Sequence, residues 1–240
     1  MISMKTVPMD EFDRAVYERN LRRIEEYTNF HKRYFKKNQF IMEEKSPFFG
    51  IMRLSPRDLS PVFDEVEKIL ENDSDFLNVN GNLAGNLKNS YELTKCVDHL
   101  GKILTPLASR LNDNINVIKG NVDFKLDTCW VNFQEKNDFN PMHTHNGDFS
   151  FVLWLKVPFL IQNELMTPKS IRSNSPSAGC FQFYYTSYDG KINDILLPID
   201  KKMEGCLAVF PAKLPHSVFP FTTSNEYRIS ISGNMIHDIY

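Results

Sequence analysis

The chain has 240 residues, of which 28 are Lys or Arg and 30 are Asp or Glu, giving a formal net charge of −2. This balance excludes the broad electrostatic attraction to nucleic acid or to an anionic membrane surface that a strongly basic protein shows. A hydrophobic content of 42% with 19 Phe predicts a folded domain with an aromatic core. We expect one domain, with a helical support region at 1–116 and a β-rich core at 117–240.

The first part of the chain is predicted to be largely helical. From Asp10 to Lys37 apolar residues recur every three to five positions between charged ones, which predicts an amphipathic helix. The apolar run Phe48–Leu54 predicts a strand. Ser60, followed by Pro61 and an apolar stripe, predicts the cap of a second helix that ends at Leu70.

The chain then passes from helices to strands. Asn78–Leu87 is rich in Asn and Gly and predicts a loop, and the apolar residues of Tyr91–Asn112 predict a third helix that Pro106 kinks or splits. After Val117 short segments rich in β-branched and aromatic residues alternate with turn residues, as in a sandwich or barrel. Eight strands are expected, at Val122–Leu126, Cys129–Gln134, Phe149–Val157, Gly179–Tyr185, Ile195–Ile199, Cys206–Phe210, His216–Phe219 and Tyr227–Met235.

Three histidines form a candidate metal site. His143 and His145 are one residue apart, and in an extended chain their imidazoles lie on the same face of one strand, where both can reach a single ion. His216, in a proline-rich turn before a predicted strand, is the third candidate ligand. His31 and His99 fall in predicted helices and are expected to be structural, whereas His237 is a weaker fourth candidate.

The identity of the ligand set stays open at this stage. The facial triad that holds iron(II) in non-heme oxygenases combines two histidines with one carboxylate. Here His145 stands at the carboxylate position, so three imidazoles would leave one more positive charge on the site. Asp148 is a possible substitute ligand if Gly147 permits a bulge that re-aims it. A further alternative uses only His145 and His216 and leaves a vacancy, as in iron halogenases.

An anion pocket is predicted beside this metal site. Arg228 and Ser230 alternate onto one face of the last predicted strand, while Ile229 faces the core. A guanidinium with a neighbouring hydroxyl is suited to holding a carboxylate.

These motifs resemble the 2-oxoglutarate/Fe(II)-dependent oxygenase superfamily, and more narrowly a His-x-His group of such oxygenases that is common in marine bacteria and their viruses. The resemblance is carried by Trp130–Gln134, Asn140–His145, Gly205–His216 and Arg228–Asn234, and it covers about 127–234. It implies a mainly β fold with helices, a double-stranded β-helix (a cupin-like jelly roll) whose N-terminal helical part packs on the larger sheet.

The resemblance also implies chemistry. Fe(II) and 2-oxoglutarate would be the cofactors, with dioxygen as co-substrate, and Arg228 and Ser230 would bind the distal carboxylate of 2-oxoglutarate. Asn132 and Tyr184 are further candidate contacts. The implied activity is that of a 2-oxoglutarate-dependent dioxygenase, expected to be a hydroxylase that couples decarboxylation of 2-oxoglutarate to C–H oxidation. Two rival hypotheses are a three-His metalloenzyme that does not use 2-oxoglutarate and a metal-free jelly-roll binding or structural protein.

The primary substrate is predicted only by class. A peptide or protein side chain is preferred over a small metabolite, because the motif layout is similar to that of prolyl hydroxylases, and neither a membrane nor a nucleic acid is expected as a partner. The loops Pro158–Ala178 and Thr186–Lys191 are the expected substrate contacts, with Lys169 and Arg172 among their few basic residues.

The cysteines and the N-terminus indicate a reducing compartment. No C-x-x-C pair is present, so a zinc ribbon is excluded and a disulfide scaffold is not expected. The N-terminus lacks the apolar core of a signal peptide. We expect a cytoplasmic protein, in the host cytoplasm if it is virus-encoded. The four thiols expected to be reduced are Cys96, Cys129, Cys180 and Cys206.

Overall fold

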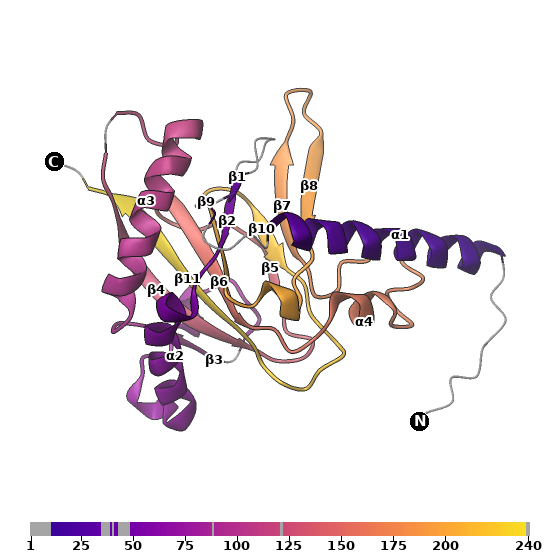
Figure 1. Cartoon of the computed structure of the whole chain (residues 1–240), viewed down its shortest axis with the longest axis horizontal. Helices are drawn as coiled ribbons and strands as arrows, with labels where there is room; N and C mark the ends of the chain where they lie inside the picture. The colour runs from indigo at the N-terminus through magenta and orange to yellow at the C-terminus, as the bar shows by residue number, and fades with distance from the viewer. Residues whose placement is uncertain are drawn as a thin grey trace.

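The computed structural model describes residues 11–34, 39, 41–42, 49–87, 89–120 and 122–238. Within them two antiparallel sheets pack face to face, with helices outside (Figure 1). The larger sheet has the strand order β1-β2-β9-β6-β11-β4-β3 and the smaller one β5-β10-β7-β8. This arrangement is mainly β with helices, and the predicted fold class is confirmed.

The larger sheet consists of β1 (Ile41–Met42), β2 (Gly50–Arg53), β3 (Asn89–Glu92), β4 (Phe124–Gln134), β6 (Phe149–Lys156), β9 (Cys206–Pro211) and β11 (Arg228–His237). The smaller sheet consists of β5 (Asn140–His143), β7 (Phe181–Thr186), β8 (Ile192–Leu197) and β10 (His216–Val218). The helices are α1 (Glu11–Tyr34), α2 (Pro56–Glu71), α3 (Val97–Ile115) and α4 (Ile161–Leu165), with 3₁₀ turns η1 (Asp73–Asp75), η2 (Asn80–Asn82) and η3 (Lys201–Met203).

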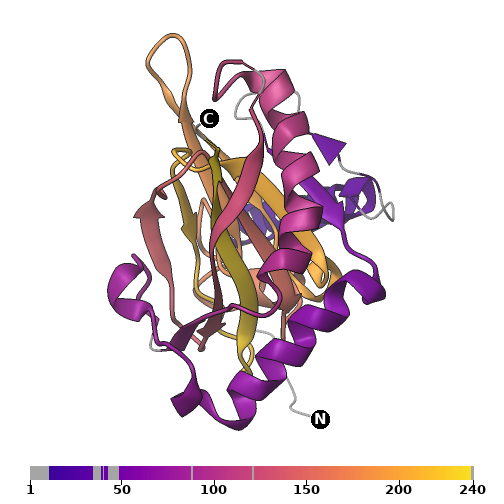
Figure 2. The same cartoon turned by 90° about the vertical axis from the view of Figure 1, so that its left-hand side faces the viewer.

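Side-chain alternation along the strands of the larger sheet builds two cores. In β6, Phe151 and Leu153 belong to a core shared with α2 and α3, whereas Val152 and Trp154 belong to a core between the two sheets. Because both faces of β6 are covered, its sequence is a nearly continuous run of apolar residues. Figure 2 shows α2 and α3 lying across one face of the larger sheet, as the resemblance implied for the N-terminal helices.

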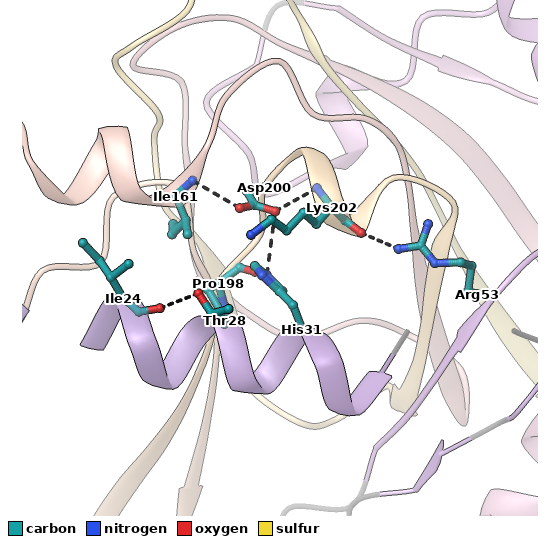
Figure 3. Close-up of polar contacts among 8 residues, drawn as sticks. All are labelled: Ile24, Thr28, His31, Arg53, Ile161, Pro198, Asp200 and Lys202. Carbon is teal, nitrogen blue, oxygen red and sulfur yellow. Dashed lines mark hydrogen bonds and ion pairs between the residues drawn. The ribbon is translucent and has the colours of Figure 1, made fainter. Parts of the chain in front are cut away.

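Helix α1 differs from that expectation. Tyr27 packs with Ile161 and Cys180 rather than against the outer face of the larger sheet. His31 is almost fully buried, and its Nε2 lies 2.8 Å from the carbonyl oxygen of Pro198 and 3.8 Å from a carboxylate oxygen of Asp200 (Figure 3). These contacts dock α1 beside α4 and the smaller sheet, and they confirm that His31 is structural.

The predicted start of the second helix was wrong by five residues. Ser55, not Ser60, caps α2: its hydroxyl accepts from the Asp58 backbone N–H while the Asp58 carboxylate accepts from the Ser55 N–H. This reciprocal capping box satisfies two N–H groups at once. Pro61 consequently lies inside α2.

The predicted third helix and two predicted strands also change. Tyr91 belongs to β3, where it pairs with Val131, and α3 begins only at Val97 and continues through Pro106 without a break. No side chain caps the start of α3. The carboxylate of Glu65 in α2 takes that role, because it accepts hydrogen bonds from the backbone N–H groups of residues 94–96, between β3 and α3. The two strands predicted at 122–126 and 129–134 form the single strand β4.

All four cysteines are free and buried, so they do not form disulfides. In the part of the chain that the structure describes, no helix combines the length and the apolarity required to cross a bilayer.

Candidate metal centre and cofactor pocket

The three predicted histidines meet where the edge of the smaller sheet enters a loop. His143 is the last residue of β5 and pairs across the sheet with His216, the first residue of β10. His145 lies beyond the end of β5, so the prediction of one strand carrying both histidines was only half right. The side-chain alternation nevertheless persists for two residues past the strand, and the rings still converge.

The nitrogen atoms of the three rings have the spacing of a metal site. One ligand nitrogen from each ring lies within 4.8 Å of the others, and Nε2 of His145 is 3.1 Å from Nε2 of His216. Two nitrogens bound to one cation at about 2.1 Å each, at right angles, would be about 3.0 Å apart. The observed separation therefore fits one edge of a facial coordination site.

Hydrogen bonds to the backbone orient two of the rings for coordination. Nδ1 of His143 lies 2.7 Å from the Pro141 carbonyl oxygen, and Nδ1 of His216 lies 2.9 Å from that of Leu214. A carbonyl oxygen only accepts, so both Nδ1 atoms carry the proton and both Nε2 atoms keep a lone pair in the neutral ring. Metal-binding histidines have this pattern of second hydrogen bonds.

Burial keeps these rings neutral. Desolvation, followed by the nearby His143 ring, lowers the pKa of His145 to about 4 and that of His216 to about 3. The pKa of His143 is also lowered, again chiefly by burial. Neutral imidazoles at pH 7 are the form that binds a metal. The donor set thus fits a divalent transition metal such as Fe(II) without prior loss of a proton.

Asp148 does not join this cluster. Its Oδ2 accepts hydrogen bonds from the backbone N–H of His237 at 2.6 Å and from Nδ1 of the same residue at 2.8 Å. Gly147 does adopt a left-handed conformation, with φ of +86°, but the turn directs Asp148 towards β11 rather than towards the metal. Asp148 and His237 therefore bind each other, and neither is part of the cluster that the three histidines form.

Arg228 is a buried cation beside the metal centre. Its guanidinium is 2% exposed and lies near the rings of Phe159 and Phe221, at 5.7 and 5.5 Å from their centroids. It donates to Gln134 Oε1 and to the carbonyl oxygens of Gly179 and Phe219. Burial lowers its pKa to about 10, which leaves it charged at neutral pH.

That cation forms no ion pair with any carboxylate of the described residues. Four of its five N–H groups are used in these bonds, which leaves one N–H on Nη1 for a ligand. An unpaired charge is costly in a buried site. A carboxylate-bearing ligand would supply the missing partner.

Ser230 and Asn132 face the same space as Arg228. They lie opposite each other on β11 and β4, and both line the cavity that the histidines reach. The Asn132 amide is already engaged, since its Oδ1 accepts from the Ser90 hydroxyl at 3.0 Å. Tyr184 is not among the lining residues, and its hydroxyl bonds to Gln182 and Ser217.

A cavity of about 450 Å³ joins the histidines to Arg228. That volume is in the range of sites that hold small ligands. The segment Leu77–Leu87, predicted only as a loop, supplies one wall, and neither loop expected to contact the substrate lines it. The apolar residues of this segment, spaced between asparagines, were the signal that could have indicated a wall rather than a free loop. They are Leu77, Val79, Leu83, Ala84 and Leu87.

Comparisons with known proteins agree with this geometry. Residues 128–234 match the family described as "Putative 2OG-Fe(II) oxygenase". No match was found among curated proteins. Among solved structures, the chain is similar to a prolyl hydroxylase from Trichoplax adhaerens in complex with a peptide fragment of hypoxia inducible factor (16% identity, TM-score 0.51, 92% of this chain and 90% of that one). It is also similar to the non-heme α-ketoglutarate-dependent epimerase SnoN from nogalamycin biosynthesis (13% identity, TM-score 0.50, 78% and 76%).

The structural likenesses, at this identity, establish the fold, a double-stranded β-helix. The family match covers the segments that contain the three histidines and Arg228, and it supports a 2-oxoglutarate-dependent dioxygenase that uses Fe(II). For residues 128–234, the match supports the 2-oxoglutarate/Fe(II)-dependent oxygenase superfamily.

Proposed function

We propose that the protein is a hydroxylase in which His143, His145 and His216 hold Fe(II), while Arg228 and Ser230 anchor 2-oxoglutarate. The observation that carries this assignment is that one cavity contains both groups: three imidazole nitrogens within 4.8 Å of one another and a buried guanidinium without a carboxylate partner among the described residues.

Each side chain has a distinct role in this proposal. The guanidinium of Arg228 offers charge and one N–H to the distal carboxylate, and the Ser230 hydroxyl can add a second hydrogen bond. Phe159 and Phe221 exclude water around Arg228, which strengthens that interaction. Asn132 acts as a spacer on the cavity wall, because its amide is committed to Ser90.

The protein contributes placement rather than acid–base catalysis. Bound Fe(II), 2-oxoglutarate and dioxygen supply the oxidative decarboxylation and the oxidation of a C–H bond. The buried ring of Trp130, whose centroid is 5.9 Å from that of His145, packs beside the histidine end of the cavity. No protein proton donor is needed to remove a hydrogen atom from carbon.

A side chain of a peptide or protein is the proposed substrate. Phe139 and Met142, next to the cavity-lining Asn140 and His143, are exposed at 40% and 63%, and Leu77 on the cavity wall is exposed at 63%. Such exposed apolar side chains around an opening suit a partner that extends beyond the cavity. The similar prolyl hydroxylase was solved with a peptide bound, which supports the same choice.

Anaerobic titration with Fe(II) and 2-oxoglutarate tests the assignment through the visible charge-transfer band of the complex. The wild type should form the band and His216→Ala should not. His99→Ala is the matched control, because His99 lies on α3 with Nε2 3.0 Å from the carbonyl oxygen of Asp58, away from the cavity. A wild-type protein without the band would remove the proposal, and so would an undiminished band in His216→Ala.

A further inference from the structure

The cavity of the proposed hydroxylase has one negative charge at its mouth. Among the described residues that line it, Glu92 is the only acid and Arg228 is the only permanently charged base. The two differ in accessibility, since Arg228 is buried whereas Glu92 is exposed at the end of β3. An entering substrate therefore meets a carboxylate first, and among the described lining residues no permanently charged base other than Arg228 is present to hold an anionic substrate.

The register of β3 directs Glu92 into the cavity. Glu92 lies opposite Trp130 of β4, and Ser90 lies opposite Asn132. The bond from the Ser90 hydroxyl to Asn132 shows that this face of β3 points inward, and Glu92 shares it. Side chains directly opposite each other in antiparallel strands have Cβ atoms about 5 Å apart. Trp130 is thus the cross-strand neighbour of Glu92, and its ring centroid is 5.9 Å from that of His145.

Asn140 adds an acceptor that lacks a donor. Its Oδ1 is buried and has no hydrogen-bond partner among the described residues, and Asn140 is one of the residues that line the cavity. Gly85 approaches it so closely that a Cβ there would lie 2.5 Å from this oxygen. The backbone N–H of Asn86, bonded to the Phe139 carbonyl at 2.9 Å, fixes that approach. A buried acceptor left unsatisfied is costly, so a ligand N–H is its natural partner.

We infer that the substrate carries an ammonium or guanidinium group, which binds between the carboxylate of Glu92 and the face of Trp130. A cation gains from both a carboxylate and an aromatic face. An N–H near the same end of the substrate donates to Oδ1 of Asn140, and the aliphatic part lies along Leu83 and Leu87 towards the histidines. This inference rests on the proposed function only for the end of the substrate that is oxidised near the histidines. It makes basic side chains and amines the substrate class.

Calorimetry with matched probes tests the inference on the anaerobic Fe(II)/2-oxoglutarate complex. The probes are acetylated, amidated pentapeptides of glycine with a central lysine, norleucine or glutamate, together with pentylammonium. We expect the lysine peptide to bind about three- to tenfold more tightly than the norleucine peptide, and the glutamate peptide to bind least. If pentylammonium binds as tightly as the lysine peptide, the substrate is assigned as a small amine. If it binds more weakly, the substrate is assigned as a peptide.

Glu92→Gln should abolish the preference for lysine and leave the affinity for norleucine unchanged. Glu67→Gln, an exposed glutamate of α2 outside the cavity, is the matched control and should change neither. Equal affinities in the wild type, a preference that survives Glu92→Gln, or no measurable binding of any probe would overturn the inference. Loss of the charge-transfer band would instead overturn the proposed function, and the same probes can then be titrated into the metal-free protein.

Discussion

Replacement of Arg228 by lysine should separate the two roles of its guanidinium. The present side chain donates to Gln134 Oε1 at 3.0 and 2.6 Å and to the carbonyl oxygens of Gly179 and Phe219 at 3.1 and 2.9 Å. A lysine ammonium keeps the charge but presents its three N–H groups from a single point. At least one of these buried acceptors would lose its donor, at a cost of about 1–3 kcal/mol.

We therefore expect Arg228→Lys to lower the free energy of unfolding by about 2 kcal/mol, measured in urea. Its affinity for 2-oxoglutarate, measured by the charge-transfer band, should fall about 10- to 150-fold, because a hydrogen bond to a charged group contributes about 1.5–3 kcal/mol. Ser230→Ala is the matched variant: it should weaken 2-oxoglutarate binding about two- to tenfold and change the unfolding free energy by less than about 0.5 kcal/mol. A destabilised Arg228→Lys protein that binds 2-oxoglutarate as the wild type does would show that Arg228 is structural only.

Three further outcomes are expected. Asp148→Ala should leave Co(II) binding, followed by absorption spectroscopy, unchanged, because the Asp148 carboxylate contacts His237 and none of the three clustered histidines, while His145→Ala should abolish it; equal loss in both would make Asp148 a ligand. Gly147→Ala should cost about 1–3 kcal/mol in urea unfolding, because φ is +86° and a Cβ would lie 2.7 Å from the Met235 carbonyl oxygen. Burial opposes the ionised form of Glu65, but hydrogen bonds from three backbone N–H groups outweigh burial and lower the pKa of this carboxyl below 4.5. The ionised carboxylate therefore stabilises the fold above pH 4.5, and this contribution to the free energy of unfolding is lost as the pH falls towards the folded-state pKa. Urea unfolding of Glu65→Gln should lack this part of the pH dependence.

The metal cluster could be predicted from the sequence because it depends mainly on local alternation. His143 and His145 are separated by one residue, so their rings share a side whether or not the strand continues. The approach of His216 depends instead on the pairing of β10 with β5, which brings it opposite His143. No local pattern in the sequence specifies that register, and only the resemblance to a family indicated that His216 lies near the other two histidines.

The start of α2 is specified by a local signal in the sequence. Two Ser-Pro pairs lie in this segment, at 55–56 and 60–61, and each would serve as a cap followed by a first-turn proline. Only Ser55 has an acidic residue, Asp58, three positions later, whereas Ser60 is followed at that position by Phe63. A capping box needs that acidic or amide side chain, so the sequence itself favours Ser55.

Other features could not be predicted because distant segments determine them. The start of α3 depends on Glu65, a residue of another helix, whose carboxylate accepts the N–H groups of Thr94 and Cys96. The position of Asp148 depends on the end of β11, where His237 holds its carboxylate. In both cases a tertiary contact decides between local conformations that the sequence allows about equally.

The histidine at position 145 changes the charge of the whole cavity. A carboxylate there would neutralise part of the charge of a divalent metal, whereas three neutral imidazoles leave it complete. Two positive centres, the metal and Arg228, would then face the two carboxylates of 2-oxoglutarate in a water-poor space, where such attraction is strong. Glu92 is the only acidic side chain among the described residues that line the cavity. The same substitution that departs from the usual triad would thus favour the dianion 2-oxoglutarate at the inner end of the cavity, while Glu92, independently of it, would favour a cation at the mouth.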